Sequence, residues 1–398
     1  MNYMKNNLLY CYIILSISAC FIIPVRGGVP FIVTSLAVPV LLYQYYREKQ
    51  ILFLYDNHIR VLYIIFIFIL LWPVIGLCTS IPFRSKMISE TWYTLCIISF
   101  LTFIIWNDYK TPSLTYQILK LLFILGCCCA LASLILYVHD LFLSAEGFSL
   151  TGIKENRLVP FGRSQHQILG AGGLAAAFFA GYSLYSGKQN FLQKCVIYCG
   201  LFLLFTVICL TQSRGPVISL IAAVLGSFYI RFRNDKIRSI LFITLICCAL
   251  PALLVLSEPL IKSIICQGTD QGICRASLRA DVWNEAVHHL LQSPFQGYGI
   301  GYRYTVNDVA HAHNTFIGIA LTRGIPVALS FFLILVLALI RTVHIADSFI
   351  RKFVIVSLFF AVGFMATDLP NPFIVLNSHY FFLWLPIALG FCSKNRLS

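Results

Sequence analysis

The chain is a succession of long apolar runs, and this pattern restricts its fold more than any other feature. A membrane-spanning helix needs about 20 mostly apolar residues, and twelve runs of roughly that kind follow one another here. Backbone groups inside lipid must be hydrogen-bonded within the protein, which leaves helices or a closed barrel. Because the runs are continuous rather than alternating, we predict an all-α polytopic membrane protein. The expected spans are 8–23, 30–46, 60–79, 88–106, 115–137, 167–186, 192–210, 214–231, 237–256, 313–340, 349–367 and 377–392.

The composition supports this class. Hydrophobic residues make up 59% of the chain and charged residues 11%, whereas soluble domains carry about 25% charged residues. The run 8–23 lacks a clear small-residue cleavage site and another span follows directly, so we expect it to be retained as a helix. No internal repeat is visible, and we treat 1–398 as a single integral membrane domain.

Lysine and arginine in the short connections predict the orientation. They gather in alternate loops, most densely at 231–238, so that side and both termini are expected to be cytoplasmic. In a bacterium, the other side would then be the periplasmic side of the inner membrane. It carries two larger loops, 138–166 and 257–312, the second between the ninth and tenth spans. Cations on the outer side favour an anionic partner, although a long loop also tolerates charge. They are Arg26, Arg84, Lys86, Lys154, Arg157, Arg163, Arg214, Lys262, Arg275, Arg279 and Arg303.

Arg214 lies in a short turn between two apolar runs, at the outer membrane boundary. Inserting a charged side chain at membrane depth costs ~2.5–3.5 kcal/mol of free energy, so such a residue usually has an oppositely charged partner or a functional role. Gly215 and Pro216 suit the start of the next helix, where free N–H groups favour an anion. The alternative is an arginine that only extends its charged end into the interface.

The polar stretch 257–314 gathers arginines and histidines, and a short amphipathic helix is expected within it, over 276–291. Ser277 is a candidate N-cap, and Asp281 adds negative charge near the start of the helix. Arg279 and Trp283 are one turn apart and share a face. A guanidinium offers two N–H groups to a phosphate. A solvated helix face is the alternative.

Histidines mark the end of this stretch, where His311, His313 and Asn314 lead into the next apolar run. Histidine is the usual general base near neutral pH, so His313 is a candidate to take a proton from a hydroxyl group that arrives from outside. Two alternatives stay open: a zinc site formed with Asp308, and a structural role for His313.

Three further features are less specific. Residues 294–301 place three glycines at alternate positions, which predicts tight turns and a close approach to a ligand backbone. Arg157 and Arg163 end the loop 138–166 and suit a second anionic group, or simply a solvated loop. Cys266 and Cys274 form a disulfide if they face an oxidising compartment, with two free thiols as the alternative.

Taken in order, these features resemble the O-antigen ligase and polymerase superfamily. The resemblance covers about 157–324: a Ser-Arg-Gly turn, Arg-x-x-x-Trp in a long loop, Pro-x-x-Gly-Tyr-Gly-x-Gly, and His-Asn entering a helix. It implies a glycosyltransferase that moves a glycan from an undecaprenyl-diphosphate carrier to an acceptor, which in the ligase branch of lipopolysaccharide biosynthesis is lipid A–core oligosaccharide. It also implies no metal and no cofactor. The positions that match the family are Arg214, Arg279 and His313, which are therefore expected to be catalytic. For substrate binding we expect Arg157, Arg163, Arg303, Trp283, His311 and Asn314.

The choice within the superfamily rests on one spaced pattern. His313 and Asn314 are followed by nine residues and then Gly324, as in the ligases, but Val327 stands where ligases have Gly, Thr or Tyr. Some polymerases carry Arg-x10-Gly in their outer loops. None of the outer arginines here has glycine eleven residues later, which favours a ligase. An O-antigen polymerase and a protein (pilin) O-oligosaccharyltransferase are the alternatives.

A transporter or flippase is disfavoured, because such proteins usually place ionisable groups near mid-membrane. Here the polar residues gather at one face. We expect lipid as the surroundings of the protein and no nucleic-acid partner.

Overall fold

A computed structural model describes residues 56–392 apart from 79–80, 111–112, 144–152, 154–155, 162–166, 186–188, 262–278, 303–311, 370 and 374–378, and also describes residues 38, 45 and 46. All regular structure in this part of the chain is helical, as predicted. Eight of these helices are long and apolar enough to cross a membrane. The chain is therefore a multi-pass membrane protein, and the total of twelve spans stays a prediction because 8–23 and 30–46 lie almost wholly outside the described residues.

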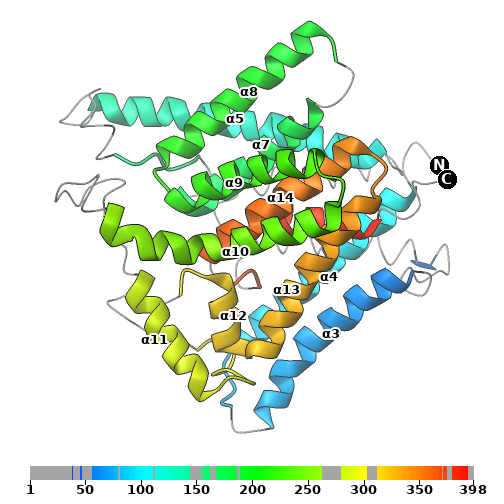
Figure 1. The fold of residues 1–398 in the computed structure, drawn as a ribbon, viewed down its shortest axis with the longest axis vertical. Helices are drawn as coiled ribbons and strands as arrows, with labels where there is room; N and C mark the ends of the chain where they lie inside the picture. The colour runs from blue at the N-terminus through cyan, green and yellow to red at the C-terminus, as the bar shows by residue number, and fades with distance from the viewer. Residues whose placement is uncertain are drawn as a thin grey trace.

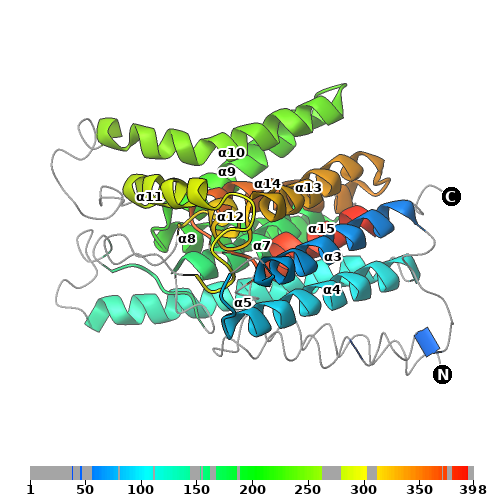
Figure 2. The same cartoon turned by 90° about the horizontal axis from the view of Figure 1, so that it is seen from below.

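The long helices lie side by side, and α11 lies toward one end of the bundle (Figure 2). Most of the expected spans between 60 and 256 agree with these helices to within a few residues. The helices are α3 (Asn57–Leu77), α4 (Lys86–Lys110), α5 (Ser113–Leu143), α7 (Gln167–Leu184), α8 (Phe191–Leu210), α9 (Arg214–Arg231), α10 (Lys236–Ile261), α11 (Arg279–Gln292), α12 (Thr315–Arg323), α13 (Ile325–Arg341), α14 (Ser348–Thr367) and α15 (Leu385–Cys392).

Short polar side chains determine where several helices begin. Asp56 accepts hydrogen bonds from the first turn of α3, and Asp347 does the same at α14. Asn190 and Gln193 form a reciprocal capping box at the start of α8. These bonds satisfy N–H groups that have no partner within the first turn of a helix.

Helix α14 runs through the middle of the bundle, packed against α7, α9, α10, α13 and α15 (Figure 1). Residues 353–367 are all buried. Close contact with α9 depends on small residues, since a Cβ on Gly363 of α14 would lie 3.0 Å from Ser219 Oγ of α9. Small residues at such contacts are typical of packed membrane helices. The contact places the start of α9 beside the end of α14.

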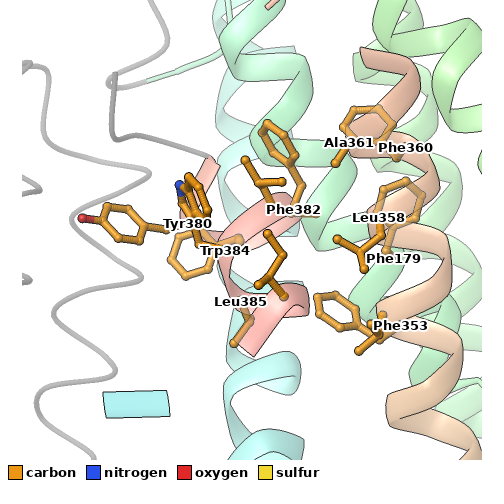
Figure 3. Close-up of a cluster of buried hydrophobic side chains, with 14 of the residues drawn as sticks. Phe179, Phe353, Leu358, Phe360, Ala361, Tyr380, Phe382, Trp384 and Leu385 are labelled. Carbon is orange, nitrogen blue, oxygen red and sulfur yellow. The ribbon is translucent and has the colours of Figure 1, made fainter. Parts of the chain in front are cut away.

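Aromatic rings fill the space between α7, α14 and the C-terminal helix (Figure 3). The ring of Phe179 in α7 lies 5.2 Å from that of Phe360 in α14, edge to face. Phe360 is in turn 5.5 Å from Phe382, in the π-helical turn Tyr380–Trp384 before α15. Such pairs contribute about 0.5–1.5 kcal/mol beyond the burial of their surface, and they keep α14 central.

An ion pair lies inside the bundle between α4 and α12. Arg323 Nη2 is 2.9 Å from Glu90 Oε2, and both residues are 2% exposed. The guanidinium also lies over the ring of Phe373, 4.7 Å from its centroid. The pair therefore connects α12, which follows His313 directly, to the N-terminal half of the chain.

The predicted span 313–340 is wrong as a single helix. Gly324 separates α12 from α13 and has φ 88, in the left-handed region that favours glycine. The N–H of Ile325 donates to Pro294 O at 2.8 Å, so the break is anchored to the glycine-containing segment 294–301.

Three other boundaries also differ from the prediction. Helix α10 continues to Ile261, into the predicted loop 257–312. Helix α5 continues to Leu143, into the predicted loop 138–166. In the last predicted span, 377–392, the described apolar helix covers Tyr380–Cys392, which is shorter than the ~20 residues of a complete span.

Candidate functional site

Asp368, which the sequence analysis did not select, lies where the end of α14 meets the start of α9. It is 3% exposed. Arg279 Nη2 of α11 forms an ion pair with its carboxylate, the backbone N–H of Gly215 donates to it, and Arg214 is near enough to act on its charge. Three segments that are distant in the sequence thus meet at one carboxylate, at one end of the bundle.

The electrostatics of Asp368 depend on these neighbours. Burial raises the pKa of Asp368, while Arg279, Arg214 and the Gly215 N–H act in the opposite direction. Removing a carboxylate from water costs several kcal/mol unless it is paired and hydrogen-bonded. Asp368 therefore needs its cationic neighbours: Arg279 pairs with it directly, and Arg214 acts on its charge.

Gly215 allows the start of α9 to lie this close to Asp368 at the end of α14. A Cβ at this position would lie 1.8 Å from Asp368 Oδ2 and 2.7 Å from Thr367 Oγ1. The sequence predicted that the start of this helix favours an anion. The group that accepts the Gly215 N–H in the structure is the protein's own carboxylate.

We expect Gly215→Ala to destabilise the protein by about 1–3 kcal/mol, because the new methyl group overlaps Asp368 and must push α9 from α14. Thermal unfolding of the detergent-solubilised protein measures the effect. Gly318→Ala is the matched control, since a Cβ at Gly318 meets nothing within 4 Å. Equal unfolding midpoints for the two variants would show that α9 and α14 are not in this close contact.

The residues after His313 are bonded to the backbone on both sides of Asp368. Asn314 Nδ2 donates to Ala366 O at 3.1 Å, and Thr315 Oγ1 donates to Leu369 O at 3.0 Å. Asn314 Oδ1 also caps α12. His313 itself is half-buried and has φ 48. These bonds place the predicted catalytic histidine on a short turn beside the end of α14.

Helix α11 contacts both Asp368 and the turn of His313, and it lies beside α12 (Figure 1). While Arg279 pairs with Asp368, Trp283 Nε1 one turn later donates to Ala312 O at 2.7 Å, directly before His313. Val282 is buried on the same side of the helix, in a small apolar cluster with Ala312. The predicted shared face of Arg279 and Trp283 is confirmed, and its contacts hold the histidine turn in place.

Arg157, in the segment between α5 and α7, bonds to the turn before Arg214. Its Nε donates to Thr211 O at 3.0 Å and its Nη2 donates to Ser213 Oγ at 3.1 Å. Gln212 between them has φ 51. Arg157 is therefore bonded to the segment that leads into Arg214, which brings a third arginine to this end of the bundle.

The segment 294–301 forms the tight turns that its glycines predict, but the close approach is to the chain itself. Gly297, Gly299 and Gly301 have φ 62, 87 and 85. A Cβ on Gly297 would lie 2.5 Å from Leu321 O, and the N–H of Tyr298 donates to the same oxygen at 2.7 Å. The segment thus anchors α12 rather than presenting a backbone to a ligand.

The predicted site residues have different outcomes. Arg279 and the start of α9, which carries Arg214, meet at Asp368, and Asn314 bonds the turn of His313 to Ala366 O near the end of α14. Trp283 bonds to Ala312 O and Arg157 to Thr211 O and Ser213 Oγ, so these two residues position neighbouring segments. Arg163, Arg303 and His311 lie outside the described residues, as do Asp308 of the zinc alternative, Ser277, Cys266 and Cys274. Asp368 was missed, although a lone acidic residue directly after an apolar run is an expensive feature in a membrane protein.

Residues 199–332 match a family model described as O-antigen ligase. The match begins in α8 and ends in α13, and it includes Arg214, Arg279 and His313. A comparison with curated proteins finds no match.

Proposed function

The chain belongs to the O-antigen ligase and polymerase superfamily, and from this premise we propose that it is an O-antigen ligase. In this proposal it transfers a glycan from undecaprenyl diphosphate to lipid A–core oligosaccharide at the periplasmic face of a bacterial inner membrane. The observation that carries the proposal is the meeting of Arg214, Arg279 and the His313 turn around Asp368.

The arginines suit the leaving group. As the bond between the anomeric carbon and the diphosphate oxygen breaks, its electron pair passes to the diphosphate. Guanidinium groups already in place stabilise that charge most strongly where water is scarce, and their forked donors match phosphate oxygens. Arg279 of α11 pairs with Asp368, and Arg214 begins α9 close enough to act on the same carboxylate. Two guanidinium groups from separate helices are therefore available to bind two parts of one diphosphate.

His313 suits the attacking group. The hydroxyl oxygen of the acceptor forms the new bond to the anomeric carbon, and its proton passes to the imidazole. Asp368 is a less suitable base because it is buried and paired with Arg279. We therefore give Asp368 a positioning role, with His313 as the proton acceptor.

The identity of the acceptor is the most specific part of the proposal, and it can be tested in cells that carry the gene. After deletion of the gene, a ligase leaves carrier-linked polymer unattached to core, while a polymerase leaves core with a single repeat unit. Loss of glycan from pilin, with normal lipopolysaccharide, would identify a protein O-oligosaccharyltransferase. Either of the last two outcomes contradicts the ligase proposal.

Replacing His313 by asparagine in the same cells is expected to lower glycan transfer about 100-fold, since loss of a general base typically costs 10²–10⁴. Asparagine tolerates the left-handed backbone of this position, so the turn keeps its shape. His344→Asn, at an exposed position after α13, is the control and should transfer normally. Normal transfer by His313→Asn would remove His313 from the mechanism.

A further inference from the structure

A second basic site lies at the opposite ends of the same helices. A cavity of about 580 Å³ is lined by Lys194 of α8, Arg231 of α9, Lys236 of α10, and Arg351 and Lys352 of α14. Arg214 and Asp368 mark the other ends of α9 and α14. Helix α9 has 18 residues, so about 27 Å separates the two sites at 1.5 Å per residue. The cavity is therefore no part of the candidate transfer site.

The charge of the cavity needs an explanation beyond membrane orientation. Charge bias requires cations in the connections, but it does not require five of them around one hollow. Among the described residues that line the cavity there is no carboxylate. Asp347 is close in sequence, but its carboxylate accepts the N–H groups of Phe349 and Ile350 at the start of α14. Like charges around a small volume repel one another, and an anion bound there relieves that repulsion.

Two of the cations are held in place by the fold. Lys352 Nζ donates to Tyr182 O at 2.9 Å and lies 3.5 Å from the centroid of the Tyr182 ring. Arg351 Nη1 donates to Ile345 O at 3.2 Å. Side chains that are already ordered lose less conformational freedom when they bind a ligand. Arg351 and Lys352 are thus already ordered at the cavity before a ligand binds.

The remaining lining indicates an amphiphile. Tyr185, Phe228, Ile230, Ile240 and Ile355 contribute apolar surface to the same cavity. Phe228 is also 55% exposed on the outside of the bundle, so an acyl chain leaving the cavity meets an aromatic side chain. Basic hollows between helix ends on the cytoplasmic side commonly hold anionic lipid headgroups, and the charge bias of the sequence predicts that this side is cytoplasmic.

We propose that this cavity binds the phosphate of an anionic phospholipid headgroup. Free phosphate has the same charge chemistry, but it would make no use of the apolar lining. The site is separate from glycan transfer and does not depend on the acceptor or donor of that reaction.

Binding to the purified full-length protein in detergent tests the proposal, with fluorescent short-chain phosphatidylglycerol as the probe. We expect Lys194→Gln/Arg351→Gln to weaken binding about 30-fold, because each cation near an anionic lipid contributes on the order of a factor of five. Lys194→Gln alone should weaken it about fivefold by the same reasoning. This single variant keeps the test valid if the double variant does not fold.

The matched control is Arg233→Gln/Arg238→Gln, which removes the same charge from the connection after α9 and the first turn of α10 without altering the cavity lining. Arg238 already pairs with Asp235 at 3.1 Å on the surface, so the control should bind almost as well as the wild type. Equal losses in both double variants would overturn the proposal, because binding would then reflect general surface charge. Equal binding of phosphatidylcholine would overturn it too, and inorganic phosphate that displaces the lipid at comparable concentration would overturn the lipid as the ligand.

Discussion

Arg279→Ala is expected to lower glycan transfer about 1000-fold, at the upper end of the loss seen when one preorganised charge-stabilising donor is removed. Arg279 is the cation that contacts Asp368 directly from α11, and in the proposed reaction it binds the departing diphosphate. Transfer is measured by reconstitution with a carrier-linked glycan and purified lipid A–core. Arg238→Ala, at an exposed position in the first turn of α10, is the control.

A purely structural role for Arg279 predicts a different outcome in a double variant. Removing Arg279 alone leaves a buried carboxylate with one cationic neighbour fewer, which is unfavourable by itself. Arg279→Ala/Asp368→Asn removes both charges, so the folding defect should largely disappear. If Arg279 binds diphosphate, the double variant is stable but inactive. Recovery of transfer in the double variant would show that Arg279 only neutralises Asp368.

Breaking the buried Glu90–Arg323 pair is expected to have the largest effect on stability. Removal of one partner of a buried ion pair costs about 3–5 kcal/mol, because the other charge stays buried without compensation. We therefore expect Glu90→Ala and Arg323→Ala each to lower the unfolding midpoint of the detergent-solubilised protein strongly. Removing the exposed Arg238–Asp235 pair should change it little.

The double replacement Glu90→Leu/Arg323→Met should recover most of that stability. Apolar side chains of similar volume often replace a buried ion pair without loss. Arg323 Nε also has no hydrogen-bond partner among the described residues, so the replacement removes an unsatisfied buried group. If the single variants are as stable as the wild type, α4 and α12 are not joined through this pair.

Much of the helical pattern is predictable because lipid imposes a strict length and composition on each span. Run 214–231 and helix α9 have the same bounds, and 192–210 differs from α8 by one residue. The prediction of one helix over 313–340 was wrong because Gly324 and Pro326 lie among apolar residues. The mean hydropathy therefore stays high where the backbone turns at Gly324, which has φ 88. Hydropathy measures the preference for lipid and does not detect a change of backbone conformation.

The candidate site was predictable in its cations and histidine but not in the group that gathers them. Arg214, Arg279 and His313 are conspicuous because charge and imidazole are rare in such a chain. Asp368 looks like an ordinary residue after a helix, and its importance arises only from its contacts with Arg279 of α11 and Gly215 of α9. A sequence pattern shows which charged residues are energetically unfavourable in a membrane protein. It does not show which residue of opposite charge pairs with them.

The sequence by itself determined the class of protein, the positions of most spans, the basic side and the residues that resemble a glycan-transferring family. These properties follow from local composition, because each span meets the same lipid independently of its neighbours. Only the tertiary structure decided that α14 is the central helix, that Asp368 joins Arg279 to the start of α9, and that five cations of four helices surround one cavity. These depend on contacts between helices that are far apart in the chain, and such contacts are set by packing at small residues such as Gly215 and Gly363 rather than by hydropathy.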